Sequence, residues 1–365
     1  MGVKLWVVSK QEPIVVKIGG SIIRAPQDLQ RISRVLIDEL LEREYRLVIT
    51  ISAIKGITDK LITLCSGNKK ALEDIREIHD KFSSELGLSG IYRDHVLGLN
   101  RELEEYSSKC IDSPEAMDRV LSIGERYLTI LLAEILEHMG VRVRIAWPWD
   151  IGLITDNRYG DASPKIPVAL INIGESLRKI LDEGYVPIVP GFIGSTEDGR
   201  ITTMGRGSSD LTAVLIARTL RSPRTLLLTE TPGIMTADPK IVPTARTVDA
   251  MDLVEGERAS RYRVKGLNQK TFLYLGEYDG EIYISDLSFR GTRICRGCRR
   301  PGIKVIAPFS HGVSAIGWGS GEILLKTSIT GVQHKIQLGD VEAVIYSDED
   351  KEELVRRLHK EVFGI

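Results

Sequence analysis

The sequence predicts an α/β fold in which helices cover both faces of a mostly parallel sheet. Short β-branched runs alternate with longer amphipathic runs along the chain, and the first of the β-branched runs leads through Gly-Gly-Ser into a helical pattern. No internal repeat or low-complexity linker interrupts this alternation. Strands and helices that alternate in this way are typical of parallel strands joined by crossover helices.

The expected elements follow one another closely. Strands are predicted at residues 13–18, 46–52, 141–147, 185–190 and 224–229, and helices at 28–42, 58–65, 120–139, 167–183 and 210–220. The charged, helix-like segment 71–117 predicts a helical excursion over an edge of the sheet. A basic stretch at 290–300 predicts a boundary before a second unit. This stretch is either a solvated loop or a contact with a partner subunit. Beyond it, expected strands at 303–308 and 341–347 and a terminal helix at 352–363 predict a small second unit.

Composition and charge limit the classes of function. The chain has 365 residues, of which 42% are hydrophobic and 27% charged, as in an ordinary globular protein of about two domains. The formal net charge of −1 gives no reason to expect nucleic acid or an anionic membrane as a partner. Because the first residues lack a signal-peptide pattern and no apolar run is long enough to span a membrane, we expect a cytoplasmic protein.

The four cysteines, Cys65, Cys110, Cys295 and Cys298, are too sparse for a disulfide scaffold, and we expect reduced thiols. The pair Cys295 and Cys298 could bind metal or act in redox chemistry. A structural zinc site normally needs a second pair of ligands, which the chain does not offer, so we interpret the pair as two unrelated thiols in a basic loop.

A Gly-Gly-Ser turn follows the first expected strand, in the run Lys17-Ile18-Gly19-Gly20-Ser21. Glycines at a strand end let backbone N–H groups approach phosphate oxygens, and Lys17 could place positive charge on a transferring phosphoryl group. The run is not a Walker A loop, because GxxxxGK[ST] is absent from the chain. A simple turn is the alternative explanation.

Two further junctions carry candidate polar groups. Residues 52–58 offer the hydroxyls of Ser52 and Thr58 to an anion, although Thr58 could act only as a helix N-cap. Glu125 lies in the run Ser-Ile-Gly-Glu-Arg and could accept hydrogen bonds from the ammonium group of a substrate. Alternatively, Glu125 only complements the positive end of the helix dipole near a helix start.

The most informative motif is Thr-Thr-Met-Gly-Arg-Gly-Ser-Ser-Asp at 202–210, which follows a hairpin-like excursion and leads into a helix. Arg206 could hold a carboxylate with two hydrogen bonds, and Ser209 and the helix start suit anionic oxygens. Asp210 could orient positive groups around a phosphoryl group. Residues 229–240 then form a Pro-Gly turn followed by Asp-Pro-Lys, which is either a ligand-binding loop at a strand end or a surface turn.

In chain order, these motifs resemble those of the aspartate kinase branch of the amino-acid kinase family. Residues 17–21 are similar to the family's KFGGTS, 52–58 to its SAxxGIT and 122–125 to its S-x-G-E. The stretch GFIG…GRITTMGRGSSD resembles GFIG…GRTTTLGRGGSD nearly letter for letter, and 230–240 resembles TDVPGIYTADPR. Acetylglutamate kinase and uridylate kinase share the fold and the first glycines but not the GRGSSD stretch.

The resemblance implies the amino-acid-kinase fold, a mostly parallel central sheet between helices, in a catalytic domain at 1–295. Residues 300–365 resemble a truncated ACT module, a small α+β unit. The family usually has two ACT modules that bind an inhibitory amino acid, and this segment has hardly room for one, so whether lysine or threonine inhibits the protein stays open. The implied reaction is phosphorylation of the side-chain carboxylate of L-aspartate by ATP, with Mg²⁺ bound through the ATP rather than by protein side chains. This is the first step toward lysine, threonine and methionine. A homodimer or a higher homo-oligomer is expected.

The resemblance also assigns roles to residues. The catalytic residues would be Lys17, Asp210 and Lys265, of which Lys265 would reach the ATP phosphates. The aspartate-binding residues would be Ser21, Thr58, Glu125, Arg206 and Ser209, with Arg206 on the α-carboxylate and Glu125 toward the ammonium. The nucleotide-binding residues would be Lys17, Gly19, Gly20, Ser52, Thr229, Glu230, Gly233, Met235, Lys240 and Lys265.

Departures from the family pattern gather on the nucleotide side. Glu230, Met235 and Lys240 stand where the family has Asp, Tyr and Arg, and Asn268-Gln269 stands where it has His-Pro. Two alternatives to an aspartate kinase therefore stay open. One is a non-catalytic or weakly active paralogue that serves as a regulatory binding subunit, and the other is a kinase for a different amino-acid carboxylate.

Overall fold

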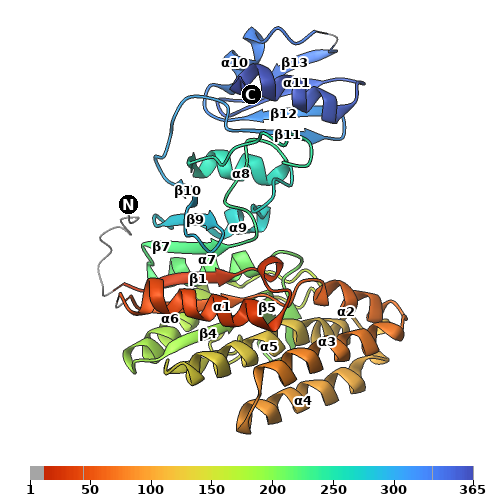
Figure 1. Cartoon of the computed structure of the whole chain (residues 1–365), viewed down its shortest axis with the longest axis vertical. Helices are drawn as coiled ribbons and strands as arrows, with labels where there is room; N and C mark the ends of the chain where they lie inside the picture. Colours follow the sequence, from red (N-terminus) through yellow and green to blue (C-terminus); the bar gives the residue numbers. More distant parts are fainter. Residues whose placement is uncertain (1–11, 44, 331, 365) are drawn as a thin grey trace. The chain divides into compact units, whose positions relative to one another are not determined.

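The computed structural model describes residues 12–43, 45–330 and 332–364. The chain divides into two compact units, the first ending at Leu228 and the second beginning at Thr229 (Figure 1). Among the described residues, no helix is long and apolar enough to cross a membrane.

The first unit is built on five parallel strands. They are β1 (Ile14–Ile18), β2 (Leu47–Ile51), β3 (Val143–Ile145), β4 (Val186–Pro190) and β7 (Arg224–Leu228), arranged in the order β3-β4-β2-β1-β7. The strands β2, β4 and β7 are buried along their whole length, because helices cover both faces of the sheet, and most of their residues are apolar. The predicted fold class is confirmed.

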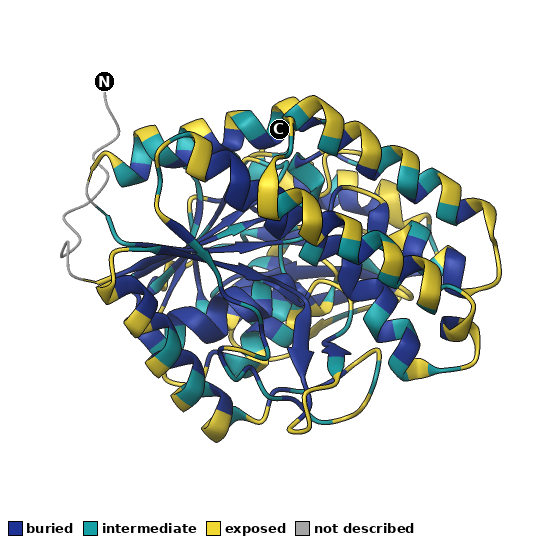
Figure 2. Ribbon diagram, turned by 90° about the horizontal axis from the view of Figure 1, so that it is seen from below, coloured by how far each residue is buried: buried dark blue, intermediate teal, exposed yellow. Residues whose placement is uncertain are grey.

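Helices of the first unit cover this sheet, with their exposed residues on the outer faces (Figure 2). They are α1 (Pro26–Leu36) with a π-helical continuation (Ile37–Leu41), α2 (Ile57–Cys65), α3 (Lys70–Leu86), α4 (Gly90–Tyr106), α5 (Pro114–His138), α6 (Ile166–Asp182) and α7 (Ser209–Leu220). Short 3₁₀ turns lie at Gly20–Ile22 and Lys109–Ile111. A two-stranded hairpin of β5 (Ile193–Ser195) and β6 (Ile201–Thr203) precedes α7, as the sequence predicted.

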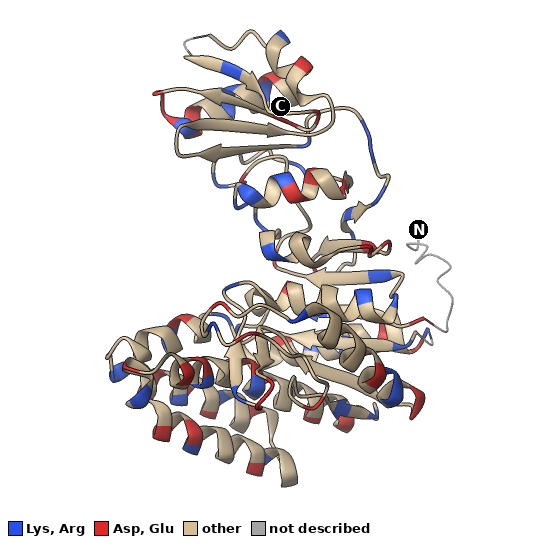
Figure 3. Ribbon diagram, turned by 180° about the vertical axis from the view of Figure 1, so that it is seen from behind, with Lys and Arg blue, Asp and Glu red and all other residues tan. Residues whose placement is uncertain are grey.

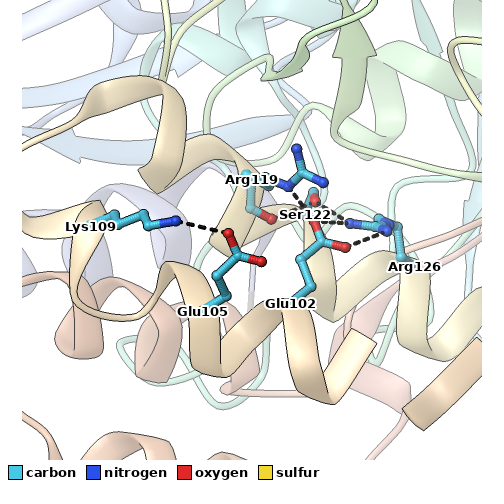
Figure 4. Close-up of polar contacts among 6 residues, drawn as sticks. All are labelled: Glu102, Glu105, Lys109, Arg119, Ser122 and Arg126. Carbon is cyan, nitrogen blue, oxygen red and sulfur yellow. Dashed lines mark hydrogen bonds and ion pairs between the residues drawn. The ribbon is translucent and has the colours of Figure 1, made fainter. Parts of the chain in front are cut away.

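The segment 71–117 is helical, as predicted, and consists mainly of α3 and α4, which carry charges of both signs (Figure 3). Glu102 of α4 fastens this excursion to α5. Its carboxylate oxygens accept hydrogen bonds from both terminal nitrogens of Arg126, each at 2.9 Å, and from Nε of Arg119 at 2.6 Å (Figure 4). Because Arg119 and Arg126 are two helical turns apart, one carboxylate links two points of α5.

Two local predictions in this unit are wrong. Glu125 does not lie near a helix start, because Ser113 caps α5 by accepting a hydrogen bond from the N–H of Ala116, and the helix begins at Pro114. Glu125 therefore lies mid-helix and does not complement a helix dipole end. Thr58 is not an N-cap either. Gly56, with φ of 85°, precedes the first residue of α2, so the hydroxyl of Thr58 belongs to the first turn.

The expectation of four reduced thiols is also wrong, because the structure holds two disulfides. Cys65 at the end of α2 pairs with Cys110, 45 positions further along the chain, with their Cα atoms 5.2 Å apart. Cys295 pairs with Cys298, with a Cα separation of 5.4 Å. Sequence spacing did not predict the first pair, since only the packing of α2 and of the helices that follow it brings these two cysteines together.

The strands of the second unit fall into two groups. In the first, β10 (Gly291–Cys295) is antiparallel to β9 (Glu281–Ser285) and parallel to β8 (Ala250–Asp252), with α8 (Leu253–Arg261) and α9 (Gln269–Tyr274) beside them. The second is antiparallel, in the order β11-β12-β14-β13, with strands β11 (Val305–Phe309), β12 (Gly312–Ile316), β13 (His334–Gln337) and β14 (Glu342–Tyr346). The helices α10 (Ser320–Lys326) and α11 (Lys351–Phe363) accompany it.

The basic stretch at 290–300 is not simply a loop. Residues Gly291–Cys295 form β10, and the side chains of Thr292 and Ile294 are buried. The hydroxyl of Thr292 donates to the carbonyl oxygen of Val248 at 2.6 Å and accepts from the N–H of Ile234. The arginines and glycines of this stretch hid the alternation of buried and exposed residues that is typical of a strand.

Candidate active site

A pocket of about 290 Å³ lies in the first unit, where β1, β2 and β4 end. Eight of the residues predicted from the sequence line it together: Lys17, Gly20, Ser21, Ser52, Thr58, Glu125, Arg206 and Ser209. The carboxyl ends of parallel strands are where open α/β sheets bind ligands. Segments far apart in the sequence, from β1 to the start of α7, thus contribute polar groups to one hollow.

Lys17, on β1, forms the charged centre of this pocket. Its Nζ lies 2.7 Å from Oδ1 of Asp210 in the first turn of α7, and the two side chains are only 13% and 16% exposed. Burial of this kind strengthens electrostatic interactions relative to those in water. The pair therefore holds a positive charge in a fixed position at the sheet edge, beside the N-terminus of a helix that also favours anions.

Gly19 and Gly20 allow the turn after β1 to pack closely. A Cβ atom on Gly20 would lie 2.3 Å from the carbonyl oxygen of Ala53, and one on Gly19 would lie 2.6 Å from that of Leu228. The N–H of Gly19 donates to the same oxygen of Leu228 at 2.9 Å. The two glycines thus have a packing reason in addition to the predicted approach to phosphate, and only Gly20 lines the pocket.

Glu125 brings a buried carboxylate to the pocket from the middle of α5. Its side chain is 3% exposed, and one oxygen accepts a hydrogen bond from the N–H of Ala53 at 3.2 Å. The other oxygen is buried without a hydrogen-bond partner among the described residues. Burial raises the pKa of Glu125 to about 8. A cationic donor such as an ammonium group would satisfy the unpaired oxygen and favour the ionised form.

Arg206 lies at the open side of the pocket, between Gly205 and Gly207, which both have positive φ. One of its terminal nitrogens lies 2.6 Å from a carboxylate oxygen of Asp59, and these side chains are 67% and 66% exposed. Ion pairs this exposed contribute little to stability, so a ligand carboxylate can replace Asp59 at small cost. Sequence reasoning missed Asp59, and a charge in the first turn of a helix is too common to single it out.

Phe192 was also missed as a pocket residue. It has φ of 70°, a conformation that costs energy for a residue with a side chain. The N–H of Met204 donates to its carbonyl oxygen at 2.9 Å. The strained backbone therefore helps to hold the segment that leads to Arg206, and a phenylalanine in a Gly-Phe-Ile-Gly run gives no sequence signal for this.

A second pocket, of about 160 Å³, lies within the second unit. Of the residues predicted to bind nucleotide, Gly233, Met235 and Lys265 line it, together with the apolar side chains of Val305 and Ile306. Glu230 lies beside it, with a carboxylate oxygen 2.5 Å from Nζ of Lys265. Apolar walls together with the cationic side chains of Arg263 and Lys265 suit a flat, partly apolar group that carries negative charge.

Besides Glu230, two predicted nucleotide residues of the second unit, Thr229 and Lys240, do not line this pocket. The N–H of Thr229 donates to the carbonyl oxygen of Ser285 at 2.8 Å, and the N–H of Lys240 donates to the side chain of Asp238 at 2.9 Å. Asn268, which stands where the family pattern has histidine, caps α9 by accepting a hydrogen bond from the N–H of Lys270. This substitution thus has a structural role in the helix.

The fold and the first pocket define an α/β protein whose parallel sheet presents a lysine, an arginine and a buried carboxylate to a small charged ligand. The chain belongs to the amino acid kinase family, whose model matches residues 12–286. It is 31% identical over 302 residues to lysine-sensitive aspartokinase 3 of Escherichia coli, covering 80% of this chain and 66% of that protein. It is 30% identical over 284 residues to an aspartokinase of Geobacillus stearothermophilus, covering 77% of this chain and 58% of that protein.

Solved structures show the same fold. The structure of E. coli aspartokinase III in complex with aspartate and ADP matches with a TM-score of 0.85 at 22% identity, covering 96% of this chain and 100% of that one. The aspartate kinase of Clostridium acetobutylicum matches with a TM-score of 0.64 at 19% identity, covering 95% of this chain and 82% of that one. The chain spans about two thirds or less of the length of the two curated relatives described above.

Proposed function

We propose that this protein is an aspartate kinase, which transfers the γ-phosphoryl group of ATP to the side-chain carboxylate of L-aspartate and forms 4-phospho-L-aspartate. One observation carries the proposal: Lys17, Glu125 and Arg206 line a single pocket. A lysine for the phosphoryl group, a carboxylate for an ammonium and an arginine for a carboxylate are the groups that this reaction needs. The names of the relatives agree with it.

The polar groups of the pocket would bind the two ends of the amino acid. The unpaired oxygen of Glu125 would accept hydrogen bonds from the ammonium, and Arg206 would exchange Asp59 for the α-carboxylate. Ser21, Thr58 and Ser209 would supply further hydrogen bonds. An amino acid held at both its ammonium and its α-carboxylate leaves its side-chain carboxylate as the group that reacts.

The chemical step needs positive charge and positioning rather than a general base. The side-chain carboxylate of aspartate is already ionised at neutral pH, so an oxygen lone pair can attack the γ-phosphorus directly. As the new O–P bond forms, the bond to the β-phosphate bridging oxygen breaks and ADP leaves. Lys17 would stabilise the negative charge of the phosphoryl oxygens, and Asp210 would hold the lysine in place.

The pocket of the second unit would hold the nucleotide. The base would pack against Met235 and its apolar neighbours, with Gly233 close to it, and Lys265 would exchange Glu230 for phosphate oxygens. Mg²⁺, when bound, offsets negative charge on the phosphates. Among the described residues, no three His, Cys, Asp or Glu side chains are grouped to hold a metal ion, so the ATP phosphates would carry it.

We extend the proposal to the setting of the enzyme. It would act in the cytoplasm as a homodimer or a higher homo-oligomer, at the first step toward lysine, threonine and methionine. The catalytic domain would comprise residues 1–295. Residues 300–365 would form an ACT-like unit that serves structure or subunit contact.

A coupled assay of ADP release with ATP, Mg²⁺ and a panel of acceptors tests the proposal. Aspartate, glutamate, acetylglutamate and uridylate would be compared at equal concentration. We expect turnover with aspartate alone. Turnover with a different acceptor would refute the assignment of substrate. Binding of aspartate without turnover by any acceptor would instead identify a regulatory paralogue.

A further inference from the structure

Asp118 is a buried carboxylate of α5 that the proposed mechanism does not use. Its side chain is fully buried, at 0% exposure. Both of its oxygens lie 2.9 Å from the N–H of Gly160. One oxygen also accepts from the N–H of Thr203 and the other from the hydroxyl of Thr203, each at 2.7 Å. One side chain thus ties three separate segments together: α5, the loop around Gly160 and the end of β6.

The position of Thr203 gives this contact its significance. Thr203 is the last residue of β6 and comes three residues before Arg206. The intervening Gly205 and the following Gly207 have positive φ and no side chain that could anchor the segment. On α5, Asp118 comes seven residues, or about two helical turns, before Glu125, so the two carboxylates lie on the same side of the helix.

We propose that Asp118 is a positioning residue, which fixes the segment 203–206 against α5 and thereby sets the separation between Arg206 and Glu125. This inference rests on the proposed function, because that separation is the distance between the groups that hold the α-carboxylate and the ammonium of the substrate. Misplacement of a binding group by about 1 Å can cost as much as a hundredfold in rate. The bonds of Asp118 are therefore expected to act on substrate binding as well as on folding.

The same helix offers a matched control. Glu134 is also buried in α5, at 1% exposure, and also accepts two hydrogen bonds, from the N–H of Ser89 at 2.7 Å and from its hydroxyl at 2.9 Å. Its partner lies at the start of α4, and neither residue lines the pocket. Replacing Glu134 by glutamine removes a buried charge of similar character without touching the Arg206 segment.

The experiment compares Asp118→Asn and Glu134→Gln with the wild type. Asparagine keeps the shape of Asp118 but directs an N–H donor toward other donors, which breaks at least one bond. We expect the KM for aspartate to rise about tenfold in D118N, with a KM for ATP within about twofold of the wild type. In E134Q both constants should stay within about twofold of the wild type. Amide hydrogen exchange at 203–208 should quicken in D118N alone.

Two milder variants keep the test informative if D118N does not fold. Thr203→Val removes the hydroxyl donor and should raise the KM for aspartate about threefold. Thr203→Ser retains the donor and should keep the KM for aspartate at the wild-type value. An unchanged KM in both D118N and T203V, or an equal rise in E134Q, would overturn the proposal. If the wild type does not phosphorylate aspartate, the proposed function fails, while the exchange of 203–208 still tests the role of Asp118 separately.

Discussion

The two pockets are built from different kinds of residue. The pocket of the first unit places Lys17, Glu125 and Arg206 around a hollow with few apolar walls, whereas the pocket of the second unit is walled by Met235, Val305 and other apolar side chains. A small zwitterion needs fixed charges at both ends, while a flat base needs apolar surface. The departures from the family pattern, such as Glu230 and Met235, gather around the second pocket, so we expect amino-acid binding to be conventional and nucleotide binding to be altered.

The largest effect is expected at Lys17. Lys17→Ala should lower kcat by about a thousandfold, because it removes a preorganised charge that stabilises the transferring phosphoryl group. Steady-state kinetics would measure this, and calorimetry should show that aspartate still binds. Lys55→Ala is the control, since Lys55 lines the same pocket but was assigned no role, and should change kcat less than about threefold. Equal losses in both variants would contradict the role of Lys17.

Arg206 tests the amino-acid end of the comparison. Arg206→Lys should raise the KM for aspartate by about a hundredfold, because a lysine cannot bind a carboxylate with two parallel hydrogen bonds. The KM for ATP should not change. Asp59→Asn removes the partner of Arg206 but keeps the arginine, and should shift either KM less than about threefold. If the KM for ATP rose as much as the KM for aspartate, the assignment of the two substrates to two different pockets would be contradicted.

If Glu125 holds the ammonium of aspartate as proposed, aspartate binding should depend on pH. Because burial raises the pKa of Glu125 to about 8, the carboxyl group is largely protonated at pH 7 and becomes ionised as the pH rises through 8. An ammonium binds the ionised form, so the dissociation constant for aspartate should fall about tenfold per pH unit below 8 and level off above it. Calorimetric titrations from pH 6 to 9 would measure this. In Glu125→Gln the dependence should disappear, and a slope that persists would point to another group.

Met235 tests the nucleotide end, with the smallest expected effect. Met235→Tyr restores the aromatic residue of the family pattern and should lower the KM for ATP about threefold, because an aromatic pair contributes about 1 kcal/mol beyond the area that it buries. The KM for aspartate should stay constant. If this variant bound ATP more weakly than the wild type, Met235 would be the residue that suits this pocket. The methionine would then not be a defect caused by losing the family's aromatic residue.

Sequence patterns predicted the framework of the fold well. The continuous apolar runs of β1, β2 and β4 can only be accommodated in a sheet covered on both faces, and the boundaries fall within two residues of those expected. The pattern failed at β10, where arginines and glycines masked a strand, and at the start of α5, which lies at Pro114 rather than at the expected residue 120.

The candidate site was predictable in its residues but less so in its contacts. Eight predicted residues meet in the first pocket because most of them lie at a strand end or a helix start at the same sheet edge, whereas Glu125 reaches the pocket from the middle of α5. Asp59, Phe192 and the Cys65–Cys110 disulfide were missed, since each depends on packing between segments that are distant in the sequence. In the second pocket Gly233, Met235 and Lys265 lie together, whereas Thr229, Glu230 and Lys240 do not line it.

The most direct test of the account is to trap the product chemically. The enzyme would be incubated with ATP, Mg²⁺, L-aspartate and hydroxylamine, which converts an acyl phosphate to a hydroxamate, and mass spectrometry would identify which carboxylate was modified. We predict the hydroxamate of the side-chain carboxylate, because under the proposal Arg206 and Glu125 hold the other end of the amino acid. A hydroxamate on the α-carboxylate, or ATP hydrolysis without any hydroxamate, would contradict the orientation of aspartate on which the account depends.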